Sequence, residues 1–171
     1  MPYIQSNNGF GLIELIVTTL IVMLMSLIAI PSFTAMNEQV RAQSSIKVIQ
    51  QSMQFARNMA ISYGRKVTVC NLKANKCTRQ WHKGYTIFLD GLTLNELSSS
   101  DKILLEVPAF NVNDIVYYNR RYVRFQADGL ASGTNGTFRY CPRVIDSPYS
   151  EAIIINQSGR VRFSRKKVIC K

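Results

Sequence analysis

The last twenty residues of the chain concentrate basic side chains that could bind phosphate groups. Between Ala152 and Lys171 the sequence carries six basic residues and no acidic residue. Arginine pairs with a phosphate through two parallel N–H bonds and stacks on bases, so this composition suits a nucleic-acid backbone. No base-reading motif accompanies it, so such binding is expected to be independent of sequence. The six residues are Arg160, Arg162, Arg165, Lys166, Lys167 and Lys171.

Two further basic clusters precede this one. Nine basic residues and no acidic one lie between Arg41 and Lys83, and a third cluster consists of Arg120, Arg121 and Arg124. The formal net charge of +11 favours a polyanionic partner, namely nucleic acid, lipopolysaccharide or an anionic membrane surface. The alternative is that these charges only form a solvated surface or pair with acids of neighbouring subunits.

The third cluster has a structural explanation of equal weight. Strand alternation would place Arg120, Tyr122 and Arg124 on one face. An exposed strand with arginine–aromatic contacts would then account for all three without a ligand.

Nothing in the chain suggests catalysis. There is no GxSxG or HExxH motif and no glycine-rich phosphate loop, and the acidic residues are scattered. The single histidine, His82, stands in the basic and polar sequence WHKG and is expected on the surface. We therefore expect a protein that is not an enzyme and that needs no cofactor.

The four cysteines indicate disulfides rather than a metal. They stand at Cys70, Cys77, Cys141 and Cys170 and allow three pairings. We favour Cys70–Cys77 as a local clip and Cys141–Cys170 as a long-range tie of the C-terminus. Zinc is the competing interpretation, but the spacings are not CxxC.

The N-terminal segment from Gly9 to Pro31 is long and apolar enough to span a bilayer. Its only charge is Glu14, and residues 15–37 carry none. A span needs about 20 apolar residues, whereas the core of a cleaved secretory signal has only about 7–15. A carboxylate in such a segment is costly without a partner. An ordinary signal anchor with an accidental glutamate is the simple alternative.

The same residues resemble the class III signal of type IV pilins and type II secretion pseudopilins. The family pattern is a glycine, then a phenylalanine, then a glutamate four residues later, and here these residues are Gly9, Phe10 and Glu14. The family often has a helix-kinking proline further along, and Pro31 stands at that position. The resemblance implies cleavage between Gly9 and Phe10 by prepilin peptidase, followed by N-methylation of Phe10. It also implies that Glu14 assists docking onto other pilins by pairing with a neighbour's Phe10 amine.

Beyond Pro31 the sequence predicts an amphipathic helix and then a β-rich region. Gly64 supplies a helix stop, and no helical pattern separates the later β-rich runs, so their sheets should be antiparallel. The buried helix stripe is predicted to contain Ala42, Ile46, Ile49, Met53, Ala56, Ala60 and Tyr63. The predicted strands are Lys66–Cys70, Tyr85–Leu89, Ile103–Val107, Ile115–Tyr118, Tyr122–Gln126, Thr137–Cys141, Ala152–Asn156 and Arg160–Phe163.

The expected fold class is α+β and type IV pilin-like. A long N-terminal helix, transmembrane and then amphipathic, would pack on an antiparallel β-rich head. The expected organisation is a removed leader at 1–9, a transmembrane and filament-core helix at 10–31, an amphipathic helix at 32–64 and the head at 65–171.

The basic C-terminal cluster is predicted to begin in a β-hairpin. Ser158-Gly159 forms the turn, and alternation along the second strand puts Val161 and Phe163 on one face. Arg160 and Arg162 would point to the opposite face. The apolar pair can then face the core while both guanidinium groups point outward.

Together, these features resemble the GspH/FimT minor pilins. The element Gly159-Arg160-Val161-Arg162 is similar to the Gly-Arg-x-Arg element of FimT proteins that act in DNA uptake. The resemblance implies that Arg160 and Arg162 contact DNA, helped by Arg165, Lys166 and Lys167. It implies a minor pilin that is held in the inner membrane with its head in the periplasm. The subunit would then enter a pilus at the cell surface and bind DNA for natural transformation.

Two alternatives to DNA uptake remain open. The chain could be a minor pseudopilin of type II secretion, with its head serving assembly for protein export. It could also be a priming or adhesive pilus subunit whose basic surface meets an anionic envelope.

Overall fold

A computed structural model describes residues 11–91 and 95–171. The proposed processing site, Gly9 and Phe10, lies outside these residues. The chain divides into two compact units, residues 1–37 and residues 38–171. We call residues 38–171 the globular unit.

One long helix, α1 (Leu12–Tyr63), begins in the first unit and ends in the second. At its start Glu14 folds back, and its Oε2 accepts the Gly11 N–H at 2.7 Å, which satisfies one unpaired donor of the first turn. Within the described residues, α1 is long and apolar enough to cross a membrane, and the side chains of the window that passes this test are not buried.

The second half of α1 packs on the globular unit through the predicted stripe. Six of the seven predicted residues, from Ala42 to Ala60, are fully buried. The prediction is wrong for Tyr63, which is 46% exposed. The reason is the helix end: Gly64 adopts φ +58°, and the N–H groups of Gly64 and Arg65 bond to the carbonyls of Ile61 and Ala60. This Schellman-type cap ends the helix, and the buried stripe ends at Ala60.

The first sheet has five antiparallel strands. Its order is β2-β1-β3-β4, and β6 pairs with β1 as well. A short 3₁₀-helix, η1 (Trp81–Lys83), connects β2 to β3 and carries His82 on the surface. The strands are β1 (Val67–Lys73), β2 (Lys76–Thr78), β3 (Tyr85–Leu89), β4 (Lys102–Val107) and β6 (Val123–Phe125).

The second sheet has four antiparallel strands in the order β5-β7-β8-β9. They are β5 (Ile115–Tyr118), β7 (Gly136–Cys141), β8 (Glu151–Ile155) and β9 (Val161–Phe163). All eight predicted strands are present, and the α+β class with antiparallel sheets is confirmed. β2 was not predicted, because its three residues, Lys-Cys-Thr, show no β pattern.

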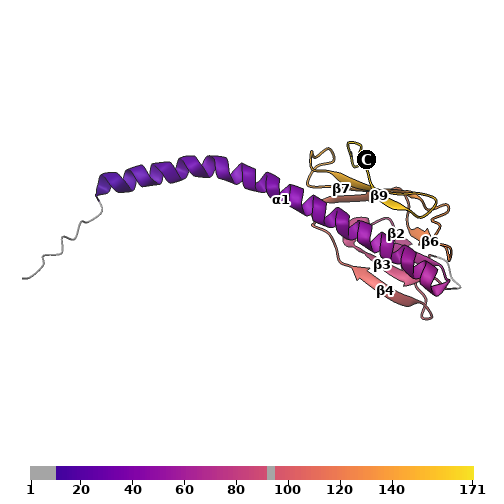
Figure 1. Cartoon of the computed structure of the whole chain (residues 1–171). Helices are drawn as coiled ribbons and strands as arrows, with labels where there is room; N and C mark the ends of the chain where they lie inside the picture. The colour runs from indigo at the N-terminus through magenta and orange to yellow at the C-terminus, as the bar shows by residue number, and fades with distance from the viewer. Residues whose placement is uncertain (1–10, 92–94) are drawn as a thin grey trace, which may run out of the picture. The chain divides into compact units, whose positions relative to one another are not determined.

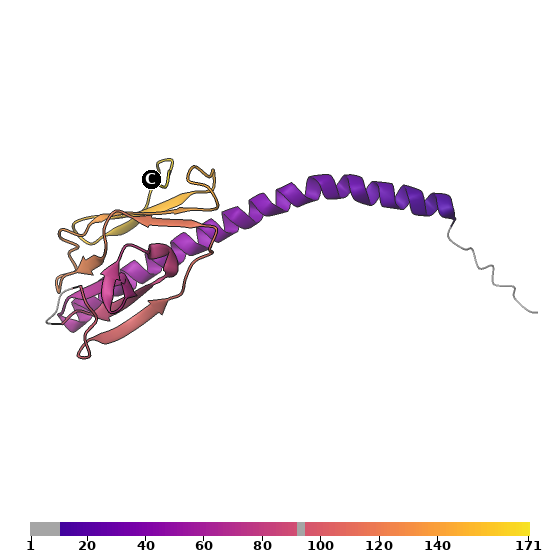
Figure 2. The ribbon, with the colours of Figure 1, turned by 180° about the vertical axis from the view of Figure 1, so that it is seen from behind.

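A single core joins α1 and both sheets. In the globular unit, α1 lies along the two sheets (Figures 1 and 2), and its stripe belongs to the same buried cluster as residues of both sheets. Trp81 packs edge-on against Phe138 and Tyr118 at ring distances of 4.8 and 5.6 Å. The Trp81 indole N–H donates to the Arg120 carbonyl at 3.0 Å, so this aromatic cluster ties η1 to the second sheet and to the start of the Arg120–Arg124 segment.

Both favoured disulfides are present. Cys70–Cys77 links β1 to β2, and Cys141–Cys170 links the end of β7 to the C-terminus. The second bridge fixes the basic C-terminal tail to the second sheet.

Candidate nucleic-acid interface

The hairpin that carries the basic cluster is built on a tight glycine turn. The Gly159 N–H bonds to the Asn156 carbonyl, and the Asn156 N–H bonds to the Arg160 carbonyl. Gly159 has φ +73°, a left-handed conformation that other residues adopt at a cost. This is a three-residue hairpin loop with glycine at its last position, as the sequence predicted for Ser158-Gly159.

Close packing is a second reason why position 159 must be glycine, and this reason was not visible in the sequence. A Cβ atom at this position would stand 1.9 Å from the Gly129 carbonyl oxygen and 3.0 Å from the Arg57 Nε. Arg57, on α1, donates its Nε to that same carbonyl at 3.2 Å. The turn is therefore held against α1 and the loop around Gly129. These contacts fix the position of Arg160, the residue that follows the turn.

The strand after the turn presents its arginines to solvent. β9 is the last strand of its sheet, and Ile154 of β8 lies opposite Arg162. Arg160 and Arg162 are exposed and Val161 is buried, as predicted. The prediction is wrong for Phe163, which is 40% exposed, because β9 is an edge strand and its last residue extends past the core.

Residues 164–171 form a strap that crosses the outer face of the second sheet, and we use that name below. At one end the Ser164 N–H bonds to the Ala152 carbonyl, and at the other Cys170 is bonded to Cys141. Arg139 of β7 donates its Nη1 to the Lys171 carbonyl at 2.8 Å. Because it is anchored at both ends, the strap holds Arg165, Lys166 and Lys167 over the sheet, and all three are exposed.

A groove of about 330 Å³ lies between the strap and the sheet. Its lining combines Lys166, Lys167 and Arg139 with the small or aliphatic side chains of Thr137 and Ile154. Arg139 was not predicted as part of this surface, since a lone arginine in a strand gives no sign of the strap that lies beside it. Its guanidinium also sits 5.6 Å from the ring centre of Tyr117, which orients it.

The five predicted contact residues share one electrostatic property. In the part of the chain that the structure describes, none of their side chains makes an ion pair or a hydrogen bond. A charged group without an internal partner keeps its hydration and can exchange it for a phosphate. The five residues, Arg160, Arg162, Arg165, Lys166 and Lys167, lie on or beside β9 and the strap, and we call them together the basic edge.

Arg124, from the third basic cluster, is buried and therefore not available to bind a phosphate group. It is 8% exposed, and its Nη2 pairs with Asp90 at 2.8 Å while its Nε donates to Asp90 and Thr68. Its guanidinium also stacks on Tyr122 at 4.8 Å, which is the aromatic contact that the structural explanation foresaw. The expectation of an exposed strand is wrong, because the loop that bears Thr134 covers β6: the Thr134 hydroxyl bonds to the Arg124 N–H and carbonyl.

A second ion pair fastens the second sheet to α1. Asp114, at the start of β5, accepts the Arg41 Nε at 2.6 Å and the Tyr140 hydroxyl. Desolvation acts to raise the pKa of Asp114, but the bonds from Arg41, Tyr140 and the Arg143 N–H outweigh it and hold the pKa below its usual value. Burial, together with the bond to Asp114, raises the pKa of Tyr140 to about 12. These arginine and carboxylate charges serve the fold.

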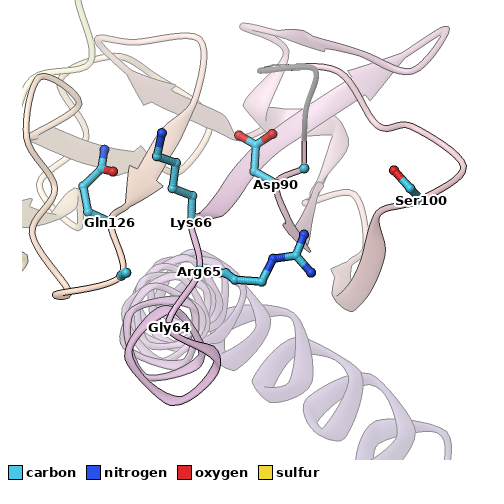
Figure 3. Close-up of a pocket in the computed structure, with 8 residues that line it drawn as sticks. Gly64, Arg65, Lys66, Asp90, Ser100 and Gln126 are labelled. Atoms are coloured by element: carbon cyan, nitrogen blue, oxygen red, sulfur yellow. The ribbon is translucent and has the colours of Figure 1, made fainter.

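A larger cavity, of about 570 Å³, lies near the end of α1 (Figure 3). Arg65 and Lys66 line it together with Asp90, Ser100 and Gln126. Asp90 is already bound to Arg124 and Thr68, so the cavity is not a distinct acidic site. It belongs to the basic region between Arg41 and Lys83 and lies apart from the strap.

The comparisons with known proteins agree with this architecture. The family model described as type II transport protein GspH matches residues 46–159. Two crystal forms of the type IV minor pilin FimU of Pseudomonas aeruginosa PAO1 share the fold. One has a TM-score of 0.63 and 23% identity over 81% of this chain and 99% of FimU. The other has a TM-score of 0.59 and 22% identity over 75% and 99%. No curated protein sequence matches the chain.

The match to the family model stops at the candidate interface. It ends at Gly159, one residue before Arg160. The basic edge therefore lies beyond the segment that this family model describes.

Proposed function

Because the chain belongs to the GspH family of pilin-like proteins, we propose that it is a minor pilin that binds DNA without sequence specificity through its basic edge. The single observation that carries this proposal is that five exposed cations on or beside an edge strand and its strap lack an ion-pair or hydrogen-bond partner among residues 11–91 and 95–171. Arg124 and Arg41, by contrast, are paired with buried carboxylates. A polyanion with closely spaced phosphate groups is a ligand that several unpaired cations on one part of the surface can bind.

The remaining parts of the proposal concern assembly. The apolar half of α1 would hold the subunit in the inner membrane and later in the filament, with Glu14 meeting a neighbour's N-terminal amine. Prepilin peptidase would act between Gly9 and Phe10. Pilus retraction, driven by other proteins, would then bring bound DNA toward the cell for natural transformation.

The test is binding of duplex DNA of random sequence to a soluble fragment that begins a few residues before Glu38. A fragment of this size is reasonable, since 99% of the crystallised FimU chain corresponds to 81% of this one. With about five phosphate contacts, the logarithm of affinity should fall with the logarithm of salt with a slope of about −4 to −5. Fluorescence anisotropy between about 50 and 200 mM salt measures this slope.

The informative variant is Arg160→Gln with Arg162→Gln. It should weaken binding about tenfold or more at low salt and make the slope less steep by about 1.8. The matched control is Arg120→Gln with Arg121→Gln, which removes the same charge from exposed positions outside the basic edge. Equal losses in both variants would mean that only net charge matters, and the proposed interface would be wrong.

A second candidate is favoured by the description of the matching family, type II transport. In that case the chain is a minor pseudopilin, and the basic edge contacts acidic surfaces of neighbouring subunits. Absence of DNA binding at about 50 mM salt, where phosphate contacts are strong, would favour this candidate.

A further inference from the structure

Exposed aliphatic side chains gather at one end of the globular unit. Val112 is 92% exposed, Val144 53%, Ile145 47% and Ile169 42%. Single exposed aliphatic residues are ordinary on a protein surface, whereas a group of them on adjoining segments calls for an explanation.

Hydrogen bonds join the three segments that carry these residues. The Arg143 N–H donates to Asp114 Oδ1 at 3.2 Å, which links the loop before β5 to the loop after β7. The Cys170 N–H donates to the Ile145 carbonyl at 2.8 Å, which adds the end of the strap. Val112, Val144, Ile145 and Ile169 therefore form one surface, which we call the apolar end.

Two ion pairs place the apolar end along α1. Arg41 pairs with Asp114 at 2.6 Å, and Glu38 pairs with Arg143 at 3.0 Å. Glu38 directly follows the uncharged segment 15–37 in the chain. The apolar end thus lies beside the first residues of α1 within the globular unit, which directly follow this uncharged segment in the chain.

The charges at this end are largely neutralised. Arg41 and Arg143 are each paired with a carboxylate, which lowers the cost of bringing them close to lipid. The remaining exposed charges of these segments are those of Asp146 and Lys171, which have opposite signs and do not form a basic patch. Attraction to anionic lipid is therefore not what this surface is suited for.

We propose that the apolar end inserts its aliphatic side chains into the interfacial layer of the bilayer while the subunit is anchored in the membrane, before it is assembled into a filament. This inference rests on the membrane anchoring proposed above. The anchor itself keeps the surface at the bilayer, so even a weak contact is populated because the effective concentration is high. The contact would fix which way the basic edge faces before assembly.

The experiment uses the full chain in phosphatidylcholine vesicles that contain lipid brominated in its upper acyl chain. Val112→Trp places a fluorophore at the most exposed position, and Leu130→Trp is the matched control. Leu130 is 38% exposed and follows Gly129, whose carbonyl bonds to Arg57. Arg57 is sixteen residues beyond Arg41, or about 24 Å further along the helix. The buried Trp81 gives the same background in both variants.

The expected result is that brominated lipid lowers the emission of Val112→Trp about twofold and leaves Leu130→Trp unchanged, with or without phosphatidylglycerol. Flotation of the chain with the vesicles is measured first, and failure to float would overturn the anchoring itself. Flotation without quenching of Val112→Trp would overturn only the present inference. Quenching that requires anionic lipid would also overturn this inference. A blue shift of the tryptophan emission that depends only on the density of protein in the vesicles would overturn it too, because it would indicate contact with another subunit.

Discussion

The tripeptide Val-Arg-Phe occurs twice as a complete strand, once as β6 (Val123–Phe125) and once as β9 (Val161–Phe163), and the two copies lie in opposite environments. All three residues of β6 are buried, whereas only the valine of β9 is. Local β preference is the same for both, so the difference comes from their neighbours.

Neighbouring segments provide Arg124 of β6 with a carboxylate partner and shield it from solvent. β6 pairs with β1, where Thr68 stands opposite Arg124, and Asp90 follows directly after β3. The Arg124 Nη2, which pairs with Asp90, also donates to the Asn95 Oδ1 at 2.7 Å. β9 has a neighbour on one side only, and Ile154, which lies opposite Arg162, offers no charge.

This contrast shows why counting basic residues does not locate a binding surface. An arginine is available to a ligand only where the fold has not already provided its counter-ion. Paired arginines should therefore affect stability when they are replaced, whereas the unpaired arginines that we propose bind DNA should affect binding.

The largest effect is expected from Arg124→Met. Its removal leaves the buried Asp90 carboxylate without its partner, which should cost about 3–5 kcal/mol of unfolding free energy. Urea unfolding of the soluble fragment measures this cost. Arg162→Met is the matched control in the same tripeptide and should cost less than about 0.5 kcal/mol. Adding Asp90→Asn to Arg124→Met should recover part of the loss, and equal costs for the two methionine variants would contradict the contrast.

Removing the bridge that anchors the strap, by Cys141→Ala with Cys170→Ala, should affect both stability and binding. Its sequence separation of 29 predicts a loss of about 3.6 kcal/mol by chain entropy. The freed strap should also bind DNA more weakly, because Lys166 and Lys167 are no longer held in place. Cys70→Ala with Cys77→Ala is the control: a separation of 7 predicts about 2.5 kcal/mol, with DNA affinity unchanged. Unchanged affinity in the first variant would mean that the strap need not be held.

Acid should weaken the ion pair of Asp114. A carboxyl whose pKa is lowered in the folded state stabilises the fold above its unfolded pKa of about 3.9, and this stability is lost as pH falls through the folded value. Unfolding free energy should therefore decline below about pH 4 in the native chain. Asp114→Asn should cost about 2 kcal/mol at pH 7 and show a shallower acid decline. Parallel pH profiles for the two proteins would rule out this assignment.

The smallest effect on stability is expected from Arg160→Gln with Arg162→Gln. Exposed side chains without partners should change the unfolding free energy by no more than about 0.5 kcal/mol. Thermal unfolding of the same samples used for DNA binding checks this. A loss above about 2 kcal/mol would show that these arginines stabilise the fold, and weakened binding could then not be assigned to lost phosphate contacts.

The elements with strong patterns were predictable from the sequence. The stripe from Ala42 to Ala60, the helix stop at Gly64 and the hairpin at Ser158-Gly159 all follow local rules, and the structure has each of them. The errors at Tyr63 and Phe163 fall at the ends of elements, where burial depends on how far the opposing surface extends.

Local pattern predicted the helix, every strand except β2 and the outward direction of Arg160 and Arg162, because these depend on residues close in the chain. Cysteine spacing favoured the observed disulfides among three possible pairings. Three-dimensional packing decided the rest. It buried Arg124 against Asp90, brought Arg139 beside the strap, and set Gly159 against Gly129 where no side chain fits. Each of these contacts joins residues about thirty positions apart, and a chain's composition does not state which distant charges will meet.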